Sequence, residues 1–322
     1  MNGLIIDAGT TNARVTLIDG EGRIRLQERR AAGARDAAVS GGPAALARAL
    51  RDAIGAILAR AGLTAADVDA CAAYGMITSN VGLCEVPHIT APAGPDALRA
   101  GIVRRTLPQI APFPIDFLPG VRNAPGGDMD MMRGEETEAV GLYSLLRPGR
   151  RCVFVLPGSH DKFVAMGAQG EILGCMTALT GELLDALTHH TILADAVGGR
   201  FVSVDGYDPA RMRQGLEAAL AAGLGRAAFA GRTLRTLGGL SAADAANYLL
   251  GAALSQDVLA LRAFSLYHPG DPLYVCGKPP VQQALCDALR AAGLDAVQGV
   301  DGALGREMGV RGARIIHGGM SR

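Results

Sequence analysis

The sequence predicts an α/β protein made of two similar domains, and a repeated hairpin is the main observation behind this prediction. A strand–turn–strand–turn–strand pattern opens the chain at residues 4–29 and recurs at residues 155–172. Gly9-Thr10 of the first copy aligns with Gly158-Ser159 of the second, which makes the pattern an internal repeat. A length of 322 residues is long for one hydrophobic core and sufficient for two such domains.

The turn of the first hairpin has the composition of a phosphate-binding turn. Gly9 lets a polyanion approach the backbone closely, because it has no side chain. Thr10 and Thr11 supply hydroxyl donors, and Asp7 supplies a carboxylate for a hydrated Mg²⁺ ion. A strand rather than a helix follows Gly9, which argues against a Rossmann or Walker loop. An ordinary turn is the alternative that this composition leaves open.

The composition argues against nucleic-acid and membrane partners. The formal net charge is zero and the pI is near 7.0, so the chain has no excess of basic groups for a phosphate backbone or an anionic membrane. No apolar run approaches the ~20 residues of a membrane-spanning helix, and the N-terminus enters a strand without a leader segment. The six cysteines form no CxxC pair, and we expect them to be reduced. These features predict a soluble, cytoplasmic protein.

Hydrophobic periodicity predicts the other elements of the first domain. Apolar residues recur at helical spacing from about Pro43 to Ala61, and Gly62 ends this helix. A buried strand is expected at residues 68–74. The stretches at residues 87–95 and 108–127 are rich in Pro and Gly and too long for simple connections. They are expected to be either substrate-binding loops or irregular surface.

The last helix of the first domain is predicted to begin near Gly134. Its apolar residues repeat on one face from Ala139 onward, and Glu135 and Glu136 stand in its first turn. One interpretation is that these carboxylates only complement the helix dipole. The other is that one of them takes the proton from a substrate hydroxyl, because this helix directly precedes the second hairpin and its N-terminus can point into a cleft.

The second domain is predicted to continue with helices and short strands. Periodicity places helices at residues 179–193, 209–222, 241–264, 281–292 and from 303 onward, with strands at 273–277 and 295–298. Gly277 ends the first of these strands ahead of a helix. This arrangement suits either a nucleoside contact or an ordinary strand-to-helix turn.

Two phosphate-binding hairpins in one chain resemble the sugar kinase, Hsp70 and actin superfamily. Its two domains have a ribonuclease H-like fold and face each other across a nucleotide cleft. Further segments are similar to the 2-dehydro-3-deoxygalactonokinase family, and the most distinctive is Met132-Arg133-Gly134-Glu135-Glu136-Thr137. The other matching segments are Asp7 to Arg14, Gly75-Met76-Ile77, Asp130-Met131, Pro157 to Phe163, Leu179 to Leu183 and His190 to Leu193.

The chain departs from the family pattern at five positions. The family usually has Trp, Leu, Gly, Thr and Trp where this chain has Ala8, Ala13, Thr78, Ser159 and Phe163. The glycines and hydroxyl groups expected to contact phosphate are retained.

The resemblance implies an ATP-dependent kinase that phosphorylates the 6-hydroxyl of 2-dehydro-3-deoxy-D-galactonate. It implies three groups of nucleotide contacts: Gly9, Thr10 and Thr11 at one end of the triphosphate, Gly158, Ser159 and His160 at the other, and Gly277 against the adenosine. Asp7 would hold Mg²⁺, through water, because Mg²⁺ gives up its hydration shell reluctantly.

The resemblance also implies the residues that bind and activate the sugar acid. Glu135 is the first candidate for the general base, and Asp130 and Asp161 follow it. Arg133 is the candidate for the substrate carboxylate, because a planar guanidinium matches two oxygens. Arg14 and Lys162 complete the substrate-binding set.

Three other functions remain open at this point. They are a kinase of a related keto-deoxy sugar acid, a phosphoanhydride hydrolase of the exopolyphosphatase type, and a non-catalytic ATP-dependent switch that resembles the Hsp70 core. The last is less favoured, because Hsp70-like chains carry a further substrate-binding domain. We expect one domain over residues 1–148 with the sugar-acid site and one over residues 149–322 with the adenosine site, in a monomer or a homodimer.

Overall fold

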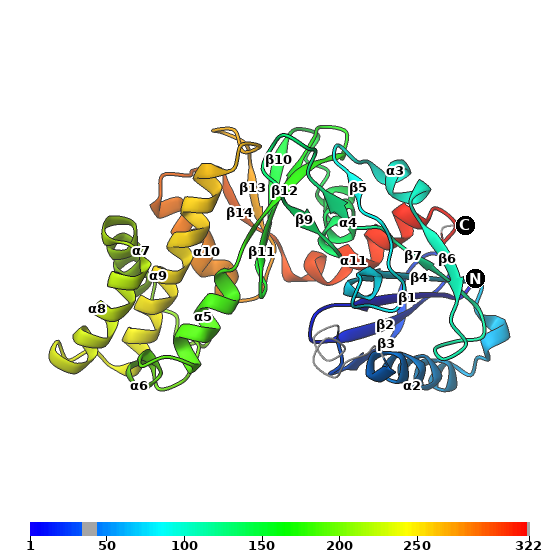
Figure 1. Cartoon of the computed structure of the whole chain (residues 1–322), viewed down its shortest axis with the longest axis horizontal. Helices are drawn as coiled ribbons and strands as arrows, with labels where there is room; N and C mark the ends of the chain where they lie inside the picture. The colour runs from blue at the N-terminus through cyan, green and yellow to red at the C-terminus, as the bar shows by residue number, and fades with distance from the viewer. Residues whose placement is uncertain (34–43, 321–322) are drawn as a thin grey trace. The chain divides into compact units, whose positions relative to one another are not determined.

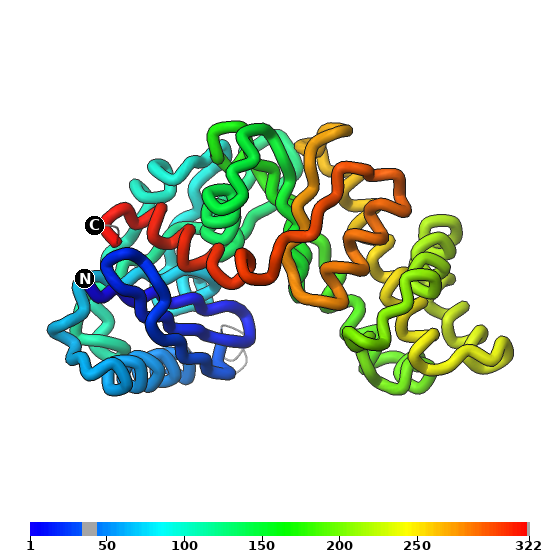
Figure 2. Tube along the Cα trace, turned by 180° about the vertical axis from the view of Figure 1, so that it is seen from behind, coloured from blue at the N-terminus to red at the C-terminus, as the bar shows by residue number. Residues whose placement is uncertain are grey.

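The computed structural model describes residues 1–33 and 44–320, which form two compact units (Figures 1 and 2). Unit 1 comprises Met1–Arg150, Met166–Gly174 and Ala303–Arg322. Unit 2 comprises Arg151–Ala165 and Cys175–Gly302. The closing helix, which the sequence analysis placed in the second domain, thus belongs almost wholly to unit 1.

Unit 1 is built on a six-stranded sheet with the order β3-β2-β1-β4-β7-β6. β1 pairs antiparallel with β2 and parallel with β4, and β7 continues the parallel part. The strands are β1 (Gly3–Ala8), β2 (Ala13–Ile18), β3 (Ile24–Arg30), β4 (Ala70–Gly75), β6 (Val103–Thr106) and β7 (Pro114–Phe117).

The second sheet repeats this arrangement, with the order β12-β11-β10-β13-β14. β13 pairs parallel with both β10 and β14. The strands are β10 (Cys152–Leu156), β11 (Asp161–Met166), β12 (Ile172–Ala178), β13 (Leu273–Val275) and β14 (Val297–Gly299). In both sheets the third, second and first strands of the repeat stand in that order and are followed by strands from later in the chain, three in the first sheet and two in the second. The predicted α/β fold with two similar domains is therefore confirmed.

Helix α2 (Ala44–Ala61) covers one face of the first sheet and packs on β2 and β3 (Figure 1). The apolar positions at helical spacing, Leu46, Leu50, Ile54 and Ile57, are buried as predicted. Gly62 follows with φ of +67°, a conformation that glycine adopts without strain. Pro43, where the sequence predicts the helix to begin, lies outside the described residues.

The two Pro- and Gly-rich stretches are more ordered than predicted. β7 lies inside the stretch 108–127 and pairs with β4. Its Pro114 is compatible with this pairing, because a proline at the first residue of a strand removes no essential ladder hydrogen bond. A third, three-stranded sheet, in unit 1, is formed by β5 (Ile89–Thr90), β8 (Val121–Arg122) and β9 (Met131–Met132). A short helix, α3 (Pro95–Ala100), follows β5.

Helices α4 (Glu135–Leu146) and α11 (Gly302–His317) pack closely in unit 1 (Figures 1 and 2). A side chain at Gly141 would lie 1.8 Å from the carbonyl of Met308, and one at Gly312 would lie 1.7 Å from that of Thr137. Glycine at both positions lets the backbones touch. This contact fixes α4, whose first turn carries the candidate base.

Unit 2 has six helices among its described residues, of which α9 is central and buried on most sides. They are α5 (Thr180–His189), α6 (Leu193–Val197), α7 (Pro209–Ala222), α8 (Leu224–Leu237), α9 (Ala242–Ala263) and α10 (Val281–Ala291). The prediction of one helix over residues 179–193 was wrong. The Thr191 hydroxyl bonds the Leu187 carbonyl and accepts from the Leu193 N–H, which separates α5 from α6.

A charged network fixes the end of α11 on the first sheet. Asp116 on β7 accepts two hydrogen bonds from the Arg104 guanidinium, at 2.7 and 2.8 Å, and one from His317 Nε2 at 2.9 Å. Burial alone would raise the pKa of Asp116, but these hydrogen bonds outweigh it and hold the pKa below its ordinary value.

The Asp116→Asn variant should therefore lose stability in a pH-dependent way. At pH 7 we expect a loss of about 1.5–3 kcal/mol, typical of hydrogen bonds to a charged group. Because the folded pKa is depressed, this stabilisation is present above ~pH 4 and is lost as pH falls through the folded pKa. Urea denaturation should show that the difference in unfolding free energy between wild type and variant is smaller at pH 3 than at pH 7. An equal difference at both pH values would contradict the network.

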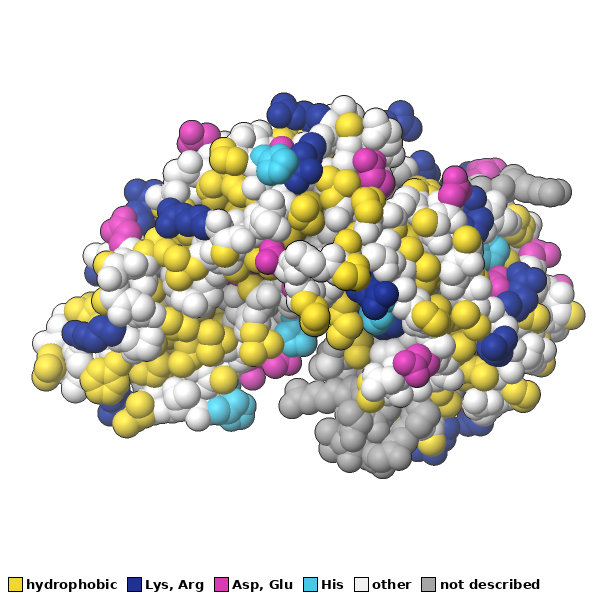
Figure 3. Space-filling view, turned by 45° about the horizontal axis from the view of Figure 1, so that its top comes forward, with side chains coloured by type: hydrophobic (Ala, Val, Ile, Leu, Met, Phe, Trp, Pro, Cys, Tyr) yellow, Lys and Arg dark blue, Asp and Glu magenta, His cyan; other side chains and the backbone are white. Residues whose placement is uncertain are grey.

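Hydrophobic side chains are seen over the helical part of unit 2, at the left of Figure 3. Separately, the exposed large hydrophobic residues of unit 2 include Phe201, Phe229 and Leu237, which is 85% exposed. None of the helices within residues 1–33 and 44–320 has the length and hydrophobicity that a membrane crossing needs.

Candidate active site

The first hairpin presents its glycine and hydroxyl groups at its tip. β1 and β2 stay in register up to the pair Ala8 and Ala13, so residues 9–12 form the turn. The Gly9 N–H donates to the Asn12 carbonyl at 2.9 Å and closes the turn. The Thr11 side chain is exposed and that of Thr10 partly so. The outward donors of this turn are therefore the threonines rather than the Gly9 N–H.

Four carboxyl groups gather beside this tip, and we call them the acidic cluster: Asp7, Glu135, Glu136 and Glu138. Asp7 is paired in register with Arg14 on β2 and with Tyr74 on β4. Its Oδ2 lies 3.9 Å from Arg14 Nη1, and the Tyr74 hydroxyl hydrogen-bonds to it. Sheet register thus places Asp7 between a cation and a phenol.

Burial dominates the electrostatics of the acidic cluster. It raises the pKa of Asp7, while Arg14 and Arg29 oppose the shift. It also raises the pKa of Glu138 well above its ordinary value, and the charges of Asp7 and Glu135 add to this effect. The Arg14 Nε is buried and has no hydrogen-bond partner among the described residues. Burial and mutual repulsion therefore favour the protonated forms of Asp7 and Glu138, and the charge of Arg14 opposes this effect.

Glu135 and Glu136 differ sharply in environment, although they are adjacent. Glu136 is 1% exposed, and both its carboxyl oxygens accept from the Gly134 N–H, at 2.8 and 3.0 Å. Burial and the charge of Glu135 raise the pKa of Glu136 to about 7. Glu135 is only partly buried, and its Oε2 accepts from the Arg133 N–H at 3.1 Å. The structure therefore gives the helix-capping role to Glu136 and leaves Glu135 toward solvent, beside Asp7.

The Arg133 guanidinium is engaged with its own chain. Nη1 donates to the carbonyl and hydroxyl of Thr78 at 2.6 and 2.7 Å. Nη2 donates to the Val86 carbonyl at 2.9 Å and contacts the His88 ring at 3.1 Å. Burial and the charge of Arg133 lower the pKa of His88 to about 4, so that ring is neutral at pH 7. Both ends of the guanidinium fork thus hold the segment 76–88.

Asp130, the second candidate base, lies on the loop before β9, where its Oδ1 accepts from the Met131 N–H at 2.7 Å. Lys162 is buried on β11 and its Nζ donates to the Thr177 hydroxyl at 2.5 Å. Neither contact indicates a role in substrate binding. Asp130 serves a local backbone turn, and the Lys162 ammonium bonds a neighbouring strand of its own sheet.

The second hairpin turn is closed by Asp161, another candidate base. The Asp161 Oδ1 accepts from the Gly158 N–H at 2.8 Å, and the Ser159 carbonyl accepts from the Glu182 N–H at 2.9 Å. His160 Nε2 lies 3.3 Å from Glu182 Oε1. The N-terminus of α5 therefore packs directly behind this turn. Gly181 makes this approach possible, because a side chain there would lie 2.0 Å from the Gly158 carbonyl.

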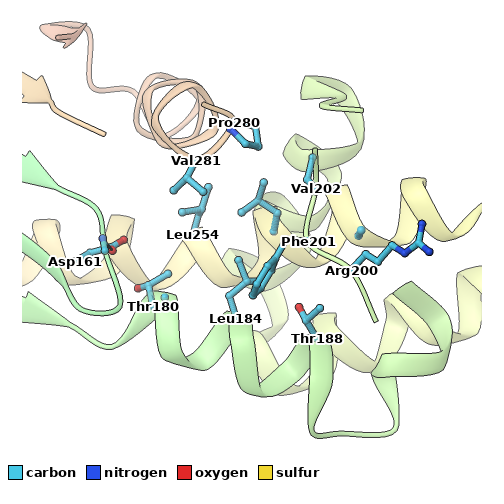
Figure 4. A pocket seen from close by; sticks show the side chains of 14 residues that line it. Asp161, Thr180, Leu184, Thr188, Arg200, Phe201, Val202, Leu254, Pro280 and Val281 are labelled. Carbon is cyan, nitrogen blue, oxygen red and sulfur yellow. Dashed lines mark hydrogen bonds between the residues drawn. The ribbon is translucent and has the colours of Figure 1, made fainter. Parts of the chain in front are cut away.

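A cavity of about 290 Å³ in unit 2 begins at this turn (Figure 4). Asp161 and Thr180 lie at one end, Arg200 lies at the other, and apolar side chains line the middle. The lining residues are Gly158, Asp161, Thr180, Gly181, Leu184, Thr188, Arg200, Phe201, Val202, Ala246, Leu250, Leu254, Pro280 and Val281. A mostly apolar cavity with polar groups at its ends is typical of a small-molecule site, and its volume is near the lower limit of the usual range.

Gly277 does not line this cavity, but it packs against the residue before the second turn. A side chain on Gly277 would lie 2.6 Å from Pro157 Cγ. Pro280 and Val281, which follow shortly after Gly277, do line the cavity.

Several residues of these sites were not identified from the sequence. Glu138 stands three residues after Glu135 and so shares its helix face, a spacing that could have linked the two. Asp257 is a lone acid within the apolar run of α9, and it accepts from the Thr180 hydroxyl at 2.7 Å. The apolar cavity lining carries no local signal, since its members come from α5, α9, α10 and the loop 200–202.

Comparison with known proteins supports the same conclusion as the motifs. A family model described as 2-keto-3-deoxy-galactonokinase matches residues 7–310. A probable 2-dehydro-3-deoxygalactonokinase from Rhizobium meliloti (strain 1021) is 31% identical over 263 residues, which cover 81% of this chain and 80% of the relative.

Solved structures share the fold. A protein from Sinorhizobium meliloti assigned as a 2-dehydro-3-deoxygalactonokinase has a TM-score of 0.78 at 24% identity, over 97% of both chains. The activator of the 2-hydroxyisocaproyl-CoA dehydratase from Clostridium difficile, solved with bound ADPNP, has a TM-score of 0.51 at 13% identity, over 98% of this chain and 93% of the other. Because the family match spans almost the whole sequence, this chain belongs to the 2-keto-3-deoxy-galactonokinase family and is a kinase, a phosphotransferase with an alcohol group as acceptor.

Proposed function

We propose that this kinase transfers the γ-phosphate of ATP to the 6-hydroxyl of 2-dehydro-3-deoxy-D-galactonate and produces the 6-phosphate. The observation that carries the assignment of its active site is the partly exposed Glu135 carboxylate beside Asp7 and Arg14, next to the Thr10-Thr11 tip. Phosphoryl transfer needs positioning and charge neutralisation more than covalent chemistry, and these groups supply both.

The cavity of unit 2 is proposed to bind the nucleoside of ATP. Its apolar middle suits a purine, and its Asp161 end opens at the Gly158-Ser159-His160 turn, where phosphates would follow. The N-terminus of α5 directs its positive dipole end toward this turn, and the Glu182 N–H in its first turn donates to the Ser159 carbonyl. Because the Gly158 N–H is used by Asp161, we assign the phosphate contacts to Ser159, His160 and α5, and give Gly158 the task of shaping the turn. Gly277 supports this site from behind Pro157.

Asp7 is proposed to hold Mg²⁺. The described residues contain no group of three or more His, Cys, Asp or Glu side chains placed to chelate an ion. A single carboxylate fits Mg²⁺, which usually takes one or two carboxylates and completes its shell with water and phosphate oxygens. When bound, the ion would neutralise negative charge on the phosphates. Asp7 and the Arg14 guanidinium would then face the reacting end of the substrates.

Glu135 is proposed to accept the proton of the acceptor hydroxyl. Its Oε2 accepts from the Arg133 N–H, which fixes the orientation of the carboxylate, and within residues 1–33 and 44–320 its other oxygen is left for the substrate. Asp130 and Asp161 are not assigned this role, because neither belongs to the acidic cluster beside Asp7 and the Thr10-Thr11 tip. Arg133 is assigned to hold the segment 76–88 at the edge of the sugar-acid site, since its fork is already occupied.

The experiment that tests this function measures ADP release with a panel of 2-keto-3-deoxy aldonic acids, with plain aldoses as controls. We expect turnover with the galactonate derivative and none with the aldoses. Preference for another member of the panel would change the substrate and keep the reaction. ATP consumption at the same rate without any sugar acid would instead support a phosphoanhydride hydrolase.

Phe201 offers a test of the nucleoside cavity. It lines the cavity, is 51% exposed, and forms a T-shaped ring pair with His189 in which the centroids are 4.8 Å apart. The Phe201→Ala variant should lose about 0.5–1.5 kcal/mol of aromatic contact, which raises KM for ATP roughly 2–10-fold with little change in kcat. Phe229 on α8 is equally exposed at 50% and does not line the cavity, so Phe229→Ala is the matched control. Equal KM values for both variants would argue against base stacking at Phe201.

A further inference from the structure

Asp257 is a fully buried acid that the proposed mechanism does not use. It lies on α9, its side chain is 0% exposed, and its Oδ1 accepts from the Thr180 hydroxyl at 2.7 Å. Its other oxygen, Oδ2, is buried and finds no hydrogen-bond donor among the described residues if every acid is ionised. An isolated buried carboxylate oxygen is costly, so this atom requires an explanation.

The explanation lies in the neighbouring carboxyl group of Asp161. Asp161 is 2% exposed and hydrogen-bonds with Asp257. Two carboxylates in contact cannot form a hydrogen bond, because both only accept. One proton on the pair turns an orphaned oxygen into a donor and removes the repulsion of two buried negative charges.

We propose that Asp161 and Asp257 share one proton, carried by Asp257, and that this pair holds the second phosphate turn in its binding shape. Neutral Asp257 donates from Oδ2 to Asp161. The Asp161 carboxylate in turn accepts from the Gly158 N–H at 2.8 Å. Thr180, the first residue of α5, fixes the other oxygen of Asp257, so the pair ties α9, α5 and the turn together. Asp257 is thus a positioning residue that acts on the turn through Asp161.

The surrounding charges agree with this assignment. Burial and the charge of Asp161 raise the pKa of Asp257 well above its ordinary value. Burial raises the pKa of Asp161, against the hydrogen bonds from Gly158 and Asp257 and the charge of His160. His160 lies 3.3 Å from Glu182 on α5. Neither of these two side chains is a hydrogen-bond partner of Asp257.

The pair has a defined effect on stability. Because the pKa of Asp257 is higher in the folded than in the unfolded chain, the folded state binds more protons above ~pH 4, and its stability falls as pH rises toward the folded pKa. An asparagine at position 257 copies the neutral acid: its amide N–H₂ donates to Asp161, and its oxygen accepts from Thr180. The Asp257→Asn variant should therefore lack this pH dependence.

The test compares melting temperatures from pH 5 to pH 9 for wild type, Asp257→Asn and Asp287→Asn. Asp287 on α10 accepts from the Tyr207 hydroxyl and touches neither acid of the pair, so its variant is the matched control for the loss of one carboxylate. As pH rises, the melting temperature of Asp257→Asn should increase relative to that of wild type. The pH dependence of this difference should correspond to about one proton bound by the folded wild type. The melting temperature of Asp287→Asn should stay parallel to that of wild type. A parallel course for Asp257→Asn, or its failure to fold at pH 7, would overturn the shared proton.

Kinetics then test the positioning role, which rests on the proposed nucleotide site. At pH 7 Asp257→Asn should keep KM for ATP within about twofold of wild type, whereas Asp257→Leu, which has no donor for Asp161, should raise it about tenfold and change kcat less. Equal KM values for the two variants would remove the positioning role. Melting temperatures in added K⁺ or Mg²⁺ distinguish a shared proton from a bound cation. If the salt raised the melting temperature of wild type but not of Asp257→Asn, a cation would take the place of the proton. The melting data need no substrate, so they stand even if the proposed sugar acid is wrong.

Discussion

Replacing Glu135 by Gln should lower kcat by roughly 10²–10⁴ and leave KM for both substrates nearly unchanged. The amide keeps the size of the side chain and can still accept from the Arg133 N–H, but it cannot take a proton. An interaction that matters only while the proton moves affects the transition state and not the ground-state complex. Steady-state kinetics of ADP release, together with ADP binding by calorimetry, measure the two quantities separately.

Glu136→Gln is the control for this prediction, because the adjacent carboxyl group performs the structural task. Both its oxygens accept from the Gly134 N–H, and its side chain is buried, so it cannot reach a substrate. We expect a change in melting temperature and a kcat within a few-fold of wild type. If Glu136→Gln were inactive and Glu135→Gln active, the roles of the two residues would have to be exchanged. An inactive Asp130→Asn beside an active Glu135→Gln would move the base to the loop before β9.

Local patterns account for the parts of the fold that the sequence predicted. The hairpins at residues 4–18 and 155–166 are defined by strand periodicity and by a glycine at the turn, and both signals lie within a few residues. The start of α4 after Gly134 was equally clear, because a glycine precedes an acidic first turn. The internal repeat predicted a second domain similar to the first, and the second sheet arranges the three strands of the repeat as the first sheet does.

The features that the sequence did not predict depend on contacts between distant segments. α11 belongs to unit 1 because Gly312 meets the Thr137 carbonyl, and no periodicity reveals which helix a glycine touches. Asp257 and Asp161 are 96 residues apart in the numbering and meet only because α9 packs beside the second turn. Arg133 was expected to bind substrate, since residue type and motif position both favoured this, yet the carbonyls of Thr78 and Val86 occupy its fork. A motif gives the residue type at a site but not which partner that residue contacts.

Gly181→Ala should raise KM for ATP roughly 5–150-fold, because the added methyl group would strike the phosphate turn itself. The new Cβ would lie 2.0 Å from the Gly158 carbonyl oxygen and 2.9 Å from Ser159 Cα. Both neighbours are backbone atoms and cannot rotate away as the end of a flexible side chain would. Overpacking of this kind typically costs ~1–3 kcal/mol, and here the atoms that must move are those that would bind phosphate.

Gly225→Ala is a control matched in position, since Gly225 is the second residue of α8 as Gly181 is the second residue of α5. A Cβ at Gly225 would meet nothing among the described residues within 4 Å. The helix preference of alanine over glycine, about 1 kcal/mol, should therefore be the whole effect there, seen as a small rise in melting temperature with normal KM. Gly181→Ala gains the same preference, so a folded variant with a weakened nucleotide site is the expected result. Normal KM for ATP in a folded Gly181→Ala would show that the turn can move without loss of binding, and the phosphate contacts would then have to lie elsewhere than at Ser159 and His160.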